Sequence, residues 1–168
     1  MLTAELLASL PPNKRTAFLK SLSKSEFDAF QHSWKRWARP NQLPPPGDWR
    51  TWLLLAGRGF GKTRSGPEAV RAGVKAGKRR IALVAPTAAD ARDVMIEGES
   101  GLLSIGLPSE RPRYKPSKRR LTWANGAIAT AYSPMSQSAC AARSMTWHGV
   151  TSSVRGVIRK PGTCLCSG

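Results

Sequence analysis

The sequence predicts an α/β fold built on a partial parallel sheet with flanking helices, and three segments carry this prediction. Residues 52–55 (WLLL) are apolar, short and followed by a glycine-rich stretch, which indicates a strand buried on both faces. Residues 64–76 have the apolar spacing of a helix, and residues 79–86 (RRIALVAP) indicate a second buried strand. A strand, a helix and a strand in this order predict a right-handed parallel crossover.

Small helices are expected ahead of the first strand. Residues 3–10 and 13–22 predict two short helices that a proline pair separates. Thr3 and Asn13 have side chains suited to capping them at their N-termini. The chain is therefore expected to begin with helices that precede the sheet.

A third helix follows and leads into a proline-rich connector. Ser23 and Glu26 have the spacing of a capping box. One helical stripe carries aromatic residues, which favours packing over stacking on nucleic-acid bases. These residues are Phe27, Phe30, Trp34 and Trp37. Residues 39–49 are rich in proline and predict an extended lead-in, so residues 1–48 form the first region.

Between the first strand and the next helix lies a glycine-rich loop that ends in Lys-Thr. Its glycines can adopt backbone angles that turn successive N–H groups toward a polyanion. Lys62 would reach the β- and γ-phosphates of ATP, and Thr63 would hold Mg²⁺. Ala56 stands where the strict motif GxxxxGK[ST] has its first glycine. The expected nucleotide contacts are Gly57, Arg58, Gly59, Phe60, Gly61, Lys62, Thr63 and Arg64.

This pattern predicts a partial P-loop NTPase domain over residues 49–133, with Lys62 and Arg58 as the candidate catalytic residues. The plain alternative is a flexible basic loop. Gln42 lies upstream, where several nucleotide motors place a glutamine that reads adenine, although a polar linker residue explains it equally well. Pro67 falls inside the following helix and predicts a kink or a late start.

Two further elements are expected after the second strand. Thr87 and Asp90 form a capping pair for a helix over residues 88–97. Residues 120–123 and 127–132 flank an Asn-Gly turn, which predicts a β-hairpin.

The charge balance points to a polyanionic partner. The 168 residues include 27 Lys and Arg but 10 Asp and Glu, which gives a net charge of +17. Six cations fall within ten residues and favour contact with a nucleic-acid backbone, although such a run can also be a solvated face. They are Arg111, Arg113, Lys115, Lys118, Arg119 and Arg120.

The compartment is expected to be the cytoplasm, without membrane association. No apolar run approaches the roughly 20 residues that span a bilayer, and the N-terminus lacks the features of a signal peptide. The three cysteines, Cys140, Cys164 and Cys166, indicate neither a disulfide framework nor a zinc site.

The character of the sequence changes near Ser133. Residues 134–168 hold every cysteine and no acidic residue, and they show no sustained period. We expect an irregular basic tail that is disordered or non-native. Either a mobile tail or a reading-frame shift just after the hairpin would explain it, and the resemblance described next favours the shift.

The segments WRTWLLLAGRGFGKTRSG, RRIALVAPTAADARDVMIEGESGLL and SKRRLTWANGAIATAYS resemble the large terminase subunit of tailed phages and gene transfer agents. The resemblance covers about residues 17–133. It implies an ATPase domain that pumps double-stranded DNA into a prohead, with a portal and a small terminase subunit as partners. It also implies a C-terminal nuclease domain of RNase H type, which the resemblance does not reach.

One departure from that family bears on activity. The family places an Asp-Glu pair after the hairpin to position Mg²⁺ and activate water, but this chain has no Asp or Glu after Glu110. We therefore expect ATP binding without efficient hydrolysis. Two rival functions remain open: a helicase-like P-loop NTPase acting on nucleic acid, and a non-enzymatic basic DNA-binding module.

Overall fold

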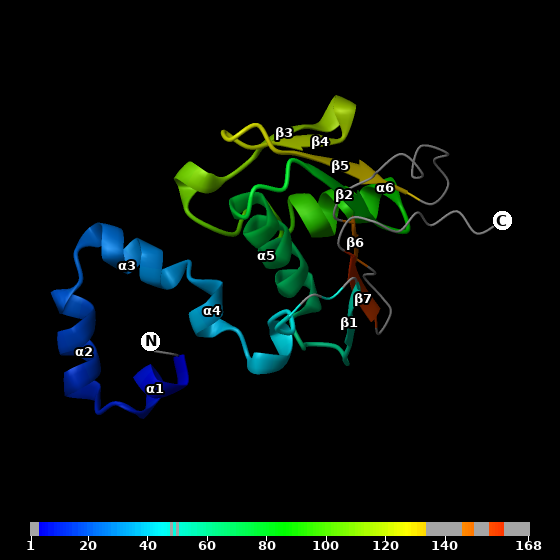
Figure 1. Cartoon of the computed structure of the whole chain (residues 1–168). Coiled ribbons are helices and arrows are strands. Elements are labelled where there is room, and N and C mark those ends of the chain that lie inside the picture. The colour runs from blue at the N-terminus through cyan, green and yellow to red at the C-terminus, as the bar shows by residue number, and fades with distance from the viewer. Residues whose placement is uncertain (1–3, 48, 50, 134–145, 150–154, 160–168) are drawn as a thin grey trace.

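The computed structural model describes residues 4–47, 49, 51–133, 146–149 and 155–159. Its architecture is α/β, with one mixed sheet and helices before and between the strands (Figure 1). The described helices and helical turns are α1 (Ala4–Ser9), α2 (Pro12–Ser21), α3 (Lys24–Gln31), α4 (Trp34–Trp37), η1 (Pro40–Gln42), α5 (Lys62–Lys75), α6 (Ala88–Asp90), η2 (Ala91–Ile96), η3 (Pro108–Glu110) and η4 (Pro116–Lys118). The described strands are β1 (Thr51–Leu55), β2 (Arg80–Val84), β3 (Arg113–Lys115), β4 (Arg120–Thr122), β5 (Ile128–Tyr132), β6 (Thr146–Gly149) and β7 (Arg155–Arg159).

The N-terminal helices match the expected order, and Figure 1 shows α1, α2 and α3 to one side of the sheet. Asn13 is not the cap of α2, because the helix begins one residue earlier at Pro12. The fixed φ of proline suits the first helical position, where its missing N–H costs nothing. The capping box of Ser23 and Glu26 is present at α3, as predicted.

The expected third helix is divided in two. α3 ends at Gln31, and α4 begins at Trp34. Phe30 is the packed centre of the aromatic stripe: its ring meets Trp37 of the stripe edge-on at 5.6 Å and Phe18 of α2 at 5.9 Å between centroids. This arrangement agrees with a packing role for the stripe. The proline-rich connector contains one 3₁₀ turn, η1, and is otherwise non-helical.

The sheet has the strand order β1-β7-β6-β2-β5-β4-β3. β2 pairs in parallel with both β5 and β6, whereas the β1–β7, β7–β6, β5–β4 and β4–β3 pairs are antiparallel. β1 and β2 come before and after α5 in the chain. These pairings make them run in the same direction, as a crossover requires. They are not neighbours, because β7 and β6 lie between them. The sheet is thus parallel only in part.

The expectation of an irregular tail after Ser133 is wrong for two segments, since β6 and β7 both belong to the sheet. These strands are four and five residues long, so neither could show a period over the longer window that pattern analysis needs. Residues 134–145, 150–154 and 160–168 lie outside the described part of the chain. The expected frame shift remains a prediction.

The expectation that the first strand is buried on both faces is also wrong. Trp52 and Leu54 are buried, but Leu53 and Leu55 are 46% and 62% exposed. β1 ends the strand order of the described sheet, and α5 packs against the face that carries Trp52 and Leu54. The second strand, β2, was also expected to be buried. This expectation is confirmed, because the consecutive residues Ile81, Ala82 and Leu83 are all buried.

The core lies between one face of the sheet and the helices α5 and η2, with Leu102 and Ile105 from the segment after η2 (Figure 1). It includes Val70, Val74, Ile81, Leu83, Met95, Ile96, Leu121 and Ala129.

α5 runs without interruption from Lys62 past Pro67, so the late start predicted for this helix does not occur. The predicted cap of Thr87 on Asp90 is present, and the helix after it becomes π-helical from Ala91. The predicted hairpin is present as β4 and β5.

Candidate phosphate-binding loop

The loop of residues 56–61 connects the end of β1 to the start of α5. Gly59 has a φ of +77° and Gly61 a φ of +91°, both in the left-handed region that side chains strongly disfavour. Gly61 is the N-cap of α5, so the chain turns into the helix through a residue that must be glycine. Gly57 is not in this region. Two of the three predicted glycines, Gly59 and Gly61, therefore have backbone angles that favour glycine.

The Lys62 ammonium folds back over this loop. Its Nζ donates to the carbonyl oxygens of Ala56 and Gly57, in each case at 2.7 Å. These carbonyls lie at the strand end of the loop, whereas Lys62 is the first residue of α5. The side chain thus ties the two ends of the loop together and places a positive charge beside it.

The first amides of α5 are open to an anion. The N–H groups of Arg64 and Ser65 both donate to the Gly61 carbonyl, at 3.0 and 2.9 Å. No described residue accepts a hydrogen bond from the amides of Lys62 or Thr63. A 14-residue helix adds the positive end of its dipole at this point. The amides, the dipole and the ammonium together fit a phosphate group.

The other predicted contacts divide into two groups. Arg58 and Thr63 are exposed, so the Thr63 hydroxyl is available to a metal ion that phosphate oxygens also hold. Phe60 is partly buried against the core, and Arg64 donates through Nε to Glu68 at 3.0 Å. The described residues contain no cluster of three His, Cys, Asp or Glu that could hold a metal ion by themselves.

Gln42 lies directly against the loop. Its side chain is buried, its Oε1 accepts the Arg39 N–H at 2.8 Å, and its Nε2 donates to the Phe60 carbonyl. Sequence analysis considered Gln42 for the site because several nucleotide motors have a glutamine upstream of the phosphate loop. In the structure, η1 holds Gln42 beside the loop.

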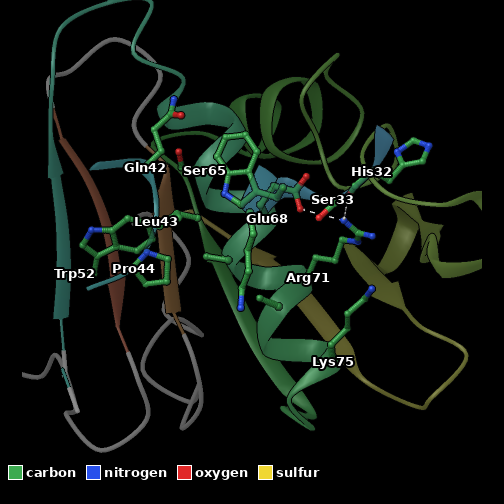
Figure 2. Close-up of a pocket in the computed structure, with 14 residues that line it drawn as sticks. His32, Ser33, Gln42, Leu43, Pro44, Trp52, Ser65, Glu68, Arg71 and Lys75 are labelled. Atoms are coloured by element: carbon green, nitrogen blue, oxygen red, sulfur yellow. Dashed lines mark hydrogen bonds and ion pairs between the residues drawn. The ribbon is translucent and has the colours of Figure 1, made fainter. Parts of the chain in front are cut away.

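Sequence reasoning missed a pocket of about 270 Å³ between α5, η1, β1 and the junction of α3 with α4. Figure 2 shows Gln42, Trp52 and Ser65 on one side and Glu68, Arg71 and Lys75 on another. Of the predicted site residues, only Gln42 lines it. The i,i+3 spacing of Glu68 and Arg71 was the available signal.

Glu68, Arg71 and Lys75, which line this pocket, belong to a chain of ion pairs. Glu68 binds Arg64 and Arg71, and Arg71 also binds Glu110 of η3. Lys75 binds Glu110 with 2.6 Å between Nζ and Oε1. Partial burial by itself would raise the pKa of Glu110, but hydrogen bonds from Lys75 and Arg71 outweigh it, and the pKa lies below its ordinary value. These contacts attach η3 to α5.

The predicted cation run does not form one continuous stripe. Strand pairing places Arg113 and Lys115 of β3 and Arg120 of β4 on the same face of the sheet, opposite the face of Leu121. Lys118 and Arg119 lie in the turn between these strands, and Arg111 donates to the Ser104 carbonyl at 3.3 Å. Through β5 the face of Arg113 continues to Arg80 of β2. Sequence analysis did not include Arg80.

The structure is an α/β fold in which a glycine-rich loop leads from a strand into the N-terminus of a 14-residue helix. The chain matches no protein-family model, no curated protein and no solved structure. In the described part of the chain, no helix has the length and apolar character that crossing a membrane requires.

Proposed function

We propose that the loop of residues 56–61 and the first turn of α5 bind the triphosphate of ATP with Mg²⁺. The observation that carries this proposal is the combination of open Lys62 and Thr63 amides with the Lys62 ammonium folded over the loop. Lys62 would exchange its carbonyl partners for phosphate oxygens, which are stronger acceptors because they are charged. Thr63 would contribute its hydroxyl to Mg²⁺.

We further propose that the chain is the ATP-binding portion of a DNA-packaging motor of the terminase large-subunit type. The resemblance over residues 17–133 supports this proposal. A basic face that lines up Arg80, Arg113, Lys115 and Arg120 supports double-stranded DNA as a partner. The two rival functions, a helicase-like NTPase and a basic DNA-binding module, use the same face.

Nucleotide binding is tested by substituting Lys62. Lys62→Ala should weaken binding of a fluorescent ATP analogue with Mg²⁺ by at least about tenfold, since it removes a charge-assisted contact to the terminal phosphates. The matched control is Lys24→Ala, an exposed lysine at the start of α3. Equal affinities for the folded parent and Lys62→Ala would reject the phosphate loop.

DNA contact is tested by neutralising the basic face. The triple variant Arg113→Gln, Lys115→Gln and Arg120→Gln should bind a short duplex more weakly than the parent. The slope of log affinity against log salt should fall by about 0.9 for each phosphate that the variant no longer neutralises. The control neutralises three exposed lysines of the N-terminal helices, Lys14, Lys20 and Lys24. Equally weakened binding in both variants would show a general charge effect and no specific face.

The same preparations separate the rival functions. A helicase-like enzyme should hydrolyse ATP faster with free DNA, whereas a non-enzymatic module should bind DNA with an affinity that ATP does not change. Coupling of DNA affinity to nucleotide without turnover supports the motor fragment.

A further inference from the structure

We propose that Gln42 is a positioning residue that holds the phosphate loop in its binding conformation and does not read the base. The site would then accept the triphosphate part of any nucleoside triphosphate. This inference rests on the proposed nucleotide binding and gives the ligand class of the same site.

η1 fixes the direction of the Gln42 side chain. Pro40 occupies the first position of this turn, and the Gln42 Oε1 accepts the N–H of Arg39 at 2.8 Å. The whole residue is 7% exposed. A long polar side chain is rarely so buried unless its hydrogen bonds are made, and here both ends of the amide have partners.

The Gln42 side chain also contacts the loop. Gln42 Nε2 donates to the carbonyl of Phe60, and a Cβ on Gly61 would lie 2.7 Å from the same nitrogen. The amide therefore lies directly against the peptide that enters the left-handed Gly61. The Gly61 carbonyl in turn accepts from the Arg64 and Ser65 amides and from the Ser65 hydroxyl. Gln42 thus connects the lead-in to the first turn of α5.

A glutamine that reads adenine needs both ends of its amide free. Selective recognition uses the amide oxygen as acceptor and the amide nitrogen as donor at the same time, because adenine presents a donor beside an acceptor. In this structure the oxygen already binds Arg39 and the nitrogen already binds Phe60. Reading a base would break both bonds and release the loop that holds the phosphates.

The test uses Gln42→Met, which keeps the length of the side chain and removes both hydrogen bonds. Its matched control is Gln31→Met, at an exposed glutamine of α3. ATP, GTP and inorganic triphosphate, each with Mg²⁺, are titrated by calorimetry, and amide hydrogen exchange of residues 57–63 is measured without ligand. We expect about tenfold weaker binding of all three ligands by Gln42→Met, together with faster exchange in the loop.

Arg39 provides a second test that leaves Gln42 in place. Arg39 has a φ of −68°, which proline also adopts, so Arg39→Pro removes only the N–H that Gln42 accepts and the arginine side chain. Arg39→Ala removes the same side chain but keeps the N–H. We expect Arg39→Pro to loosen the loop more than Arg39→Ala does.

Two outcomes would overturn the inference. Weaker binding of ATP alone would assign Gln42 to the base, and unchanged loop exchange in both Gln42→Met and Arg39→Pro would remove its positioning role. If the parent binds none of the three ligands, the proposed nucleotide binding fails, and loop exchange by itself then decides the role of Gln42.

Discussion

Glu68 is an acidic residue buried inside a strongly basic chain, and two arginines explain how it can be there. Its side chain is 2% exposed and lies between Arg64, at 2.9 Å, and Arg71, at 3.2 Å. Arg64 also lies over the Trp34 ring, 5.7 Å from its centroid. A buried carboxylate is tolerated when charged hydrogen bonds replace its hydration. Arg64, which Glu68 binds, thereby connects the first turns of α5 with α4.

At this residue we predict a large stability effect. Glu68→Ala should lower the free energy of unfolding by about 3 kcal/mol, because it leaves two arginines without their shared partner. Glu68→Gln should have a smaller effect, since the amide oxygen still accepts. Urea unfolding monitored by tryptophan fluorescence measures both variants, and Asp28→Ala, on α3, serves as a control for removing one negative charge. A Glu68→Ala variant as stable as the parent would show that the ion pairs contribute nothing.

Between elements, the contact of α5 with η3 depends on Glu110. Arg71 and Lys75 of α5 both bind the carboxylate of Glu110. Because the folded state lowers the pKa of Glu110, the unfolded state binds its proton more readily. The stabilisation is therefore fully present above the ordinary pKa of 4.5 and disappears as the pH falls through the lower folded value.

The prediction for this contact is a pH-dependent difference. At pH 7 the parent should be more stable than Glu110→Gln by about 1 kcal/mol, as expected for a partly exposed charged hydrogen bond. The difference should shrink as the pH drops below 4.5. Urea unfolding of both proteins between pH 3 and pH 7 measures it. A constant difference across this range would mean that the charge of Glu110 is not involved.

Across the molecule, hydrolysis at the loop would need a carboxylate that positions Mg²⁺ and the attacking water. Glu68 is held by arginines, and Asp93 is paired with its neighbour Arg92. Asp90, Glu97 and Glu99 follow β2 and lie on or after the helix there. Phosphoryl transfer to water requires an oriented water and a metal held from both sides. The loop that we propose to bind ATP would supply phosphate contacts and one hydroxyl for the metal.

We therefore predict binding without rapid turnover. Phosphate release with ATP and Mg²⁺ should stay below about 0.1 per second, with or without DNA, since the absence of water positioning costs about two to four orders of magnitude. Lys62→Ala provides the background rate. DNA-stimulated turnover near 1 per second that Lys62→Ala abolishes would show that one of these acidic residues acts as the missing group.

The local features of this protein could be predicted from its sequence. The glycine-rich loop before Lys62, the Ser23 and Thr87 caps and the hairpin of β4 and β5 all occur where the pattern placed them. Each depends on backbone preferences and hydrogen bonds within a few residues, so short windows of sequence contain the necessary information.

Tertiary structure alone decided which distant segments meet. It placed β6 and β7 between β1 and β2, left Leu53 and Leu55 exposed, and aligned Arg80 with Arg113 across three strand pairings. It also brought Gln42 against Phe60, which lies 18 residues further along the chain, and against Gly61. Such contacts follow from how the whole chain distributes its apolar surface among competing strand pairings, and no local pattern encodes that choice.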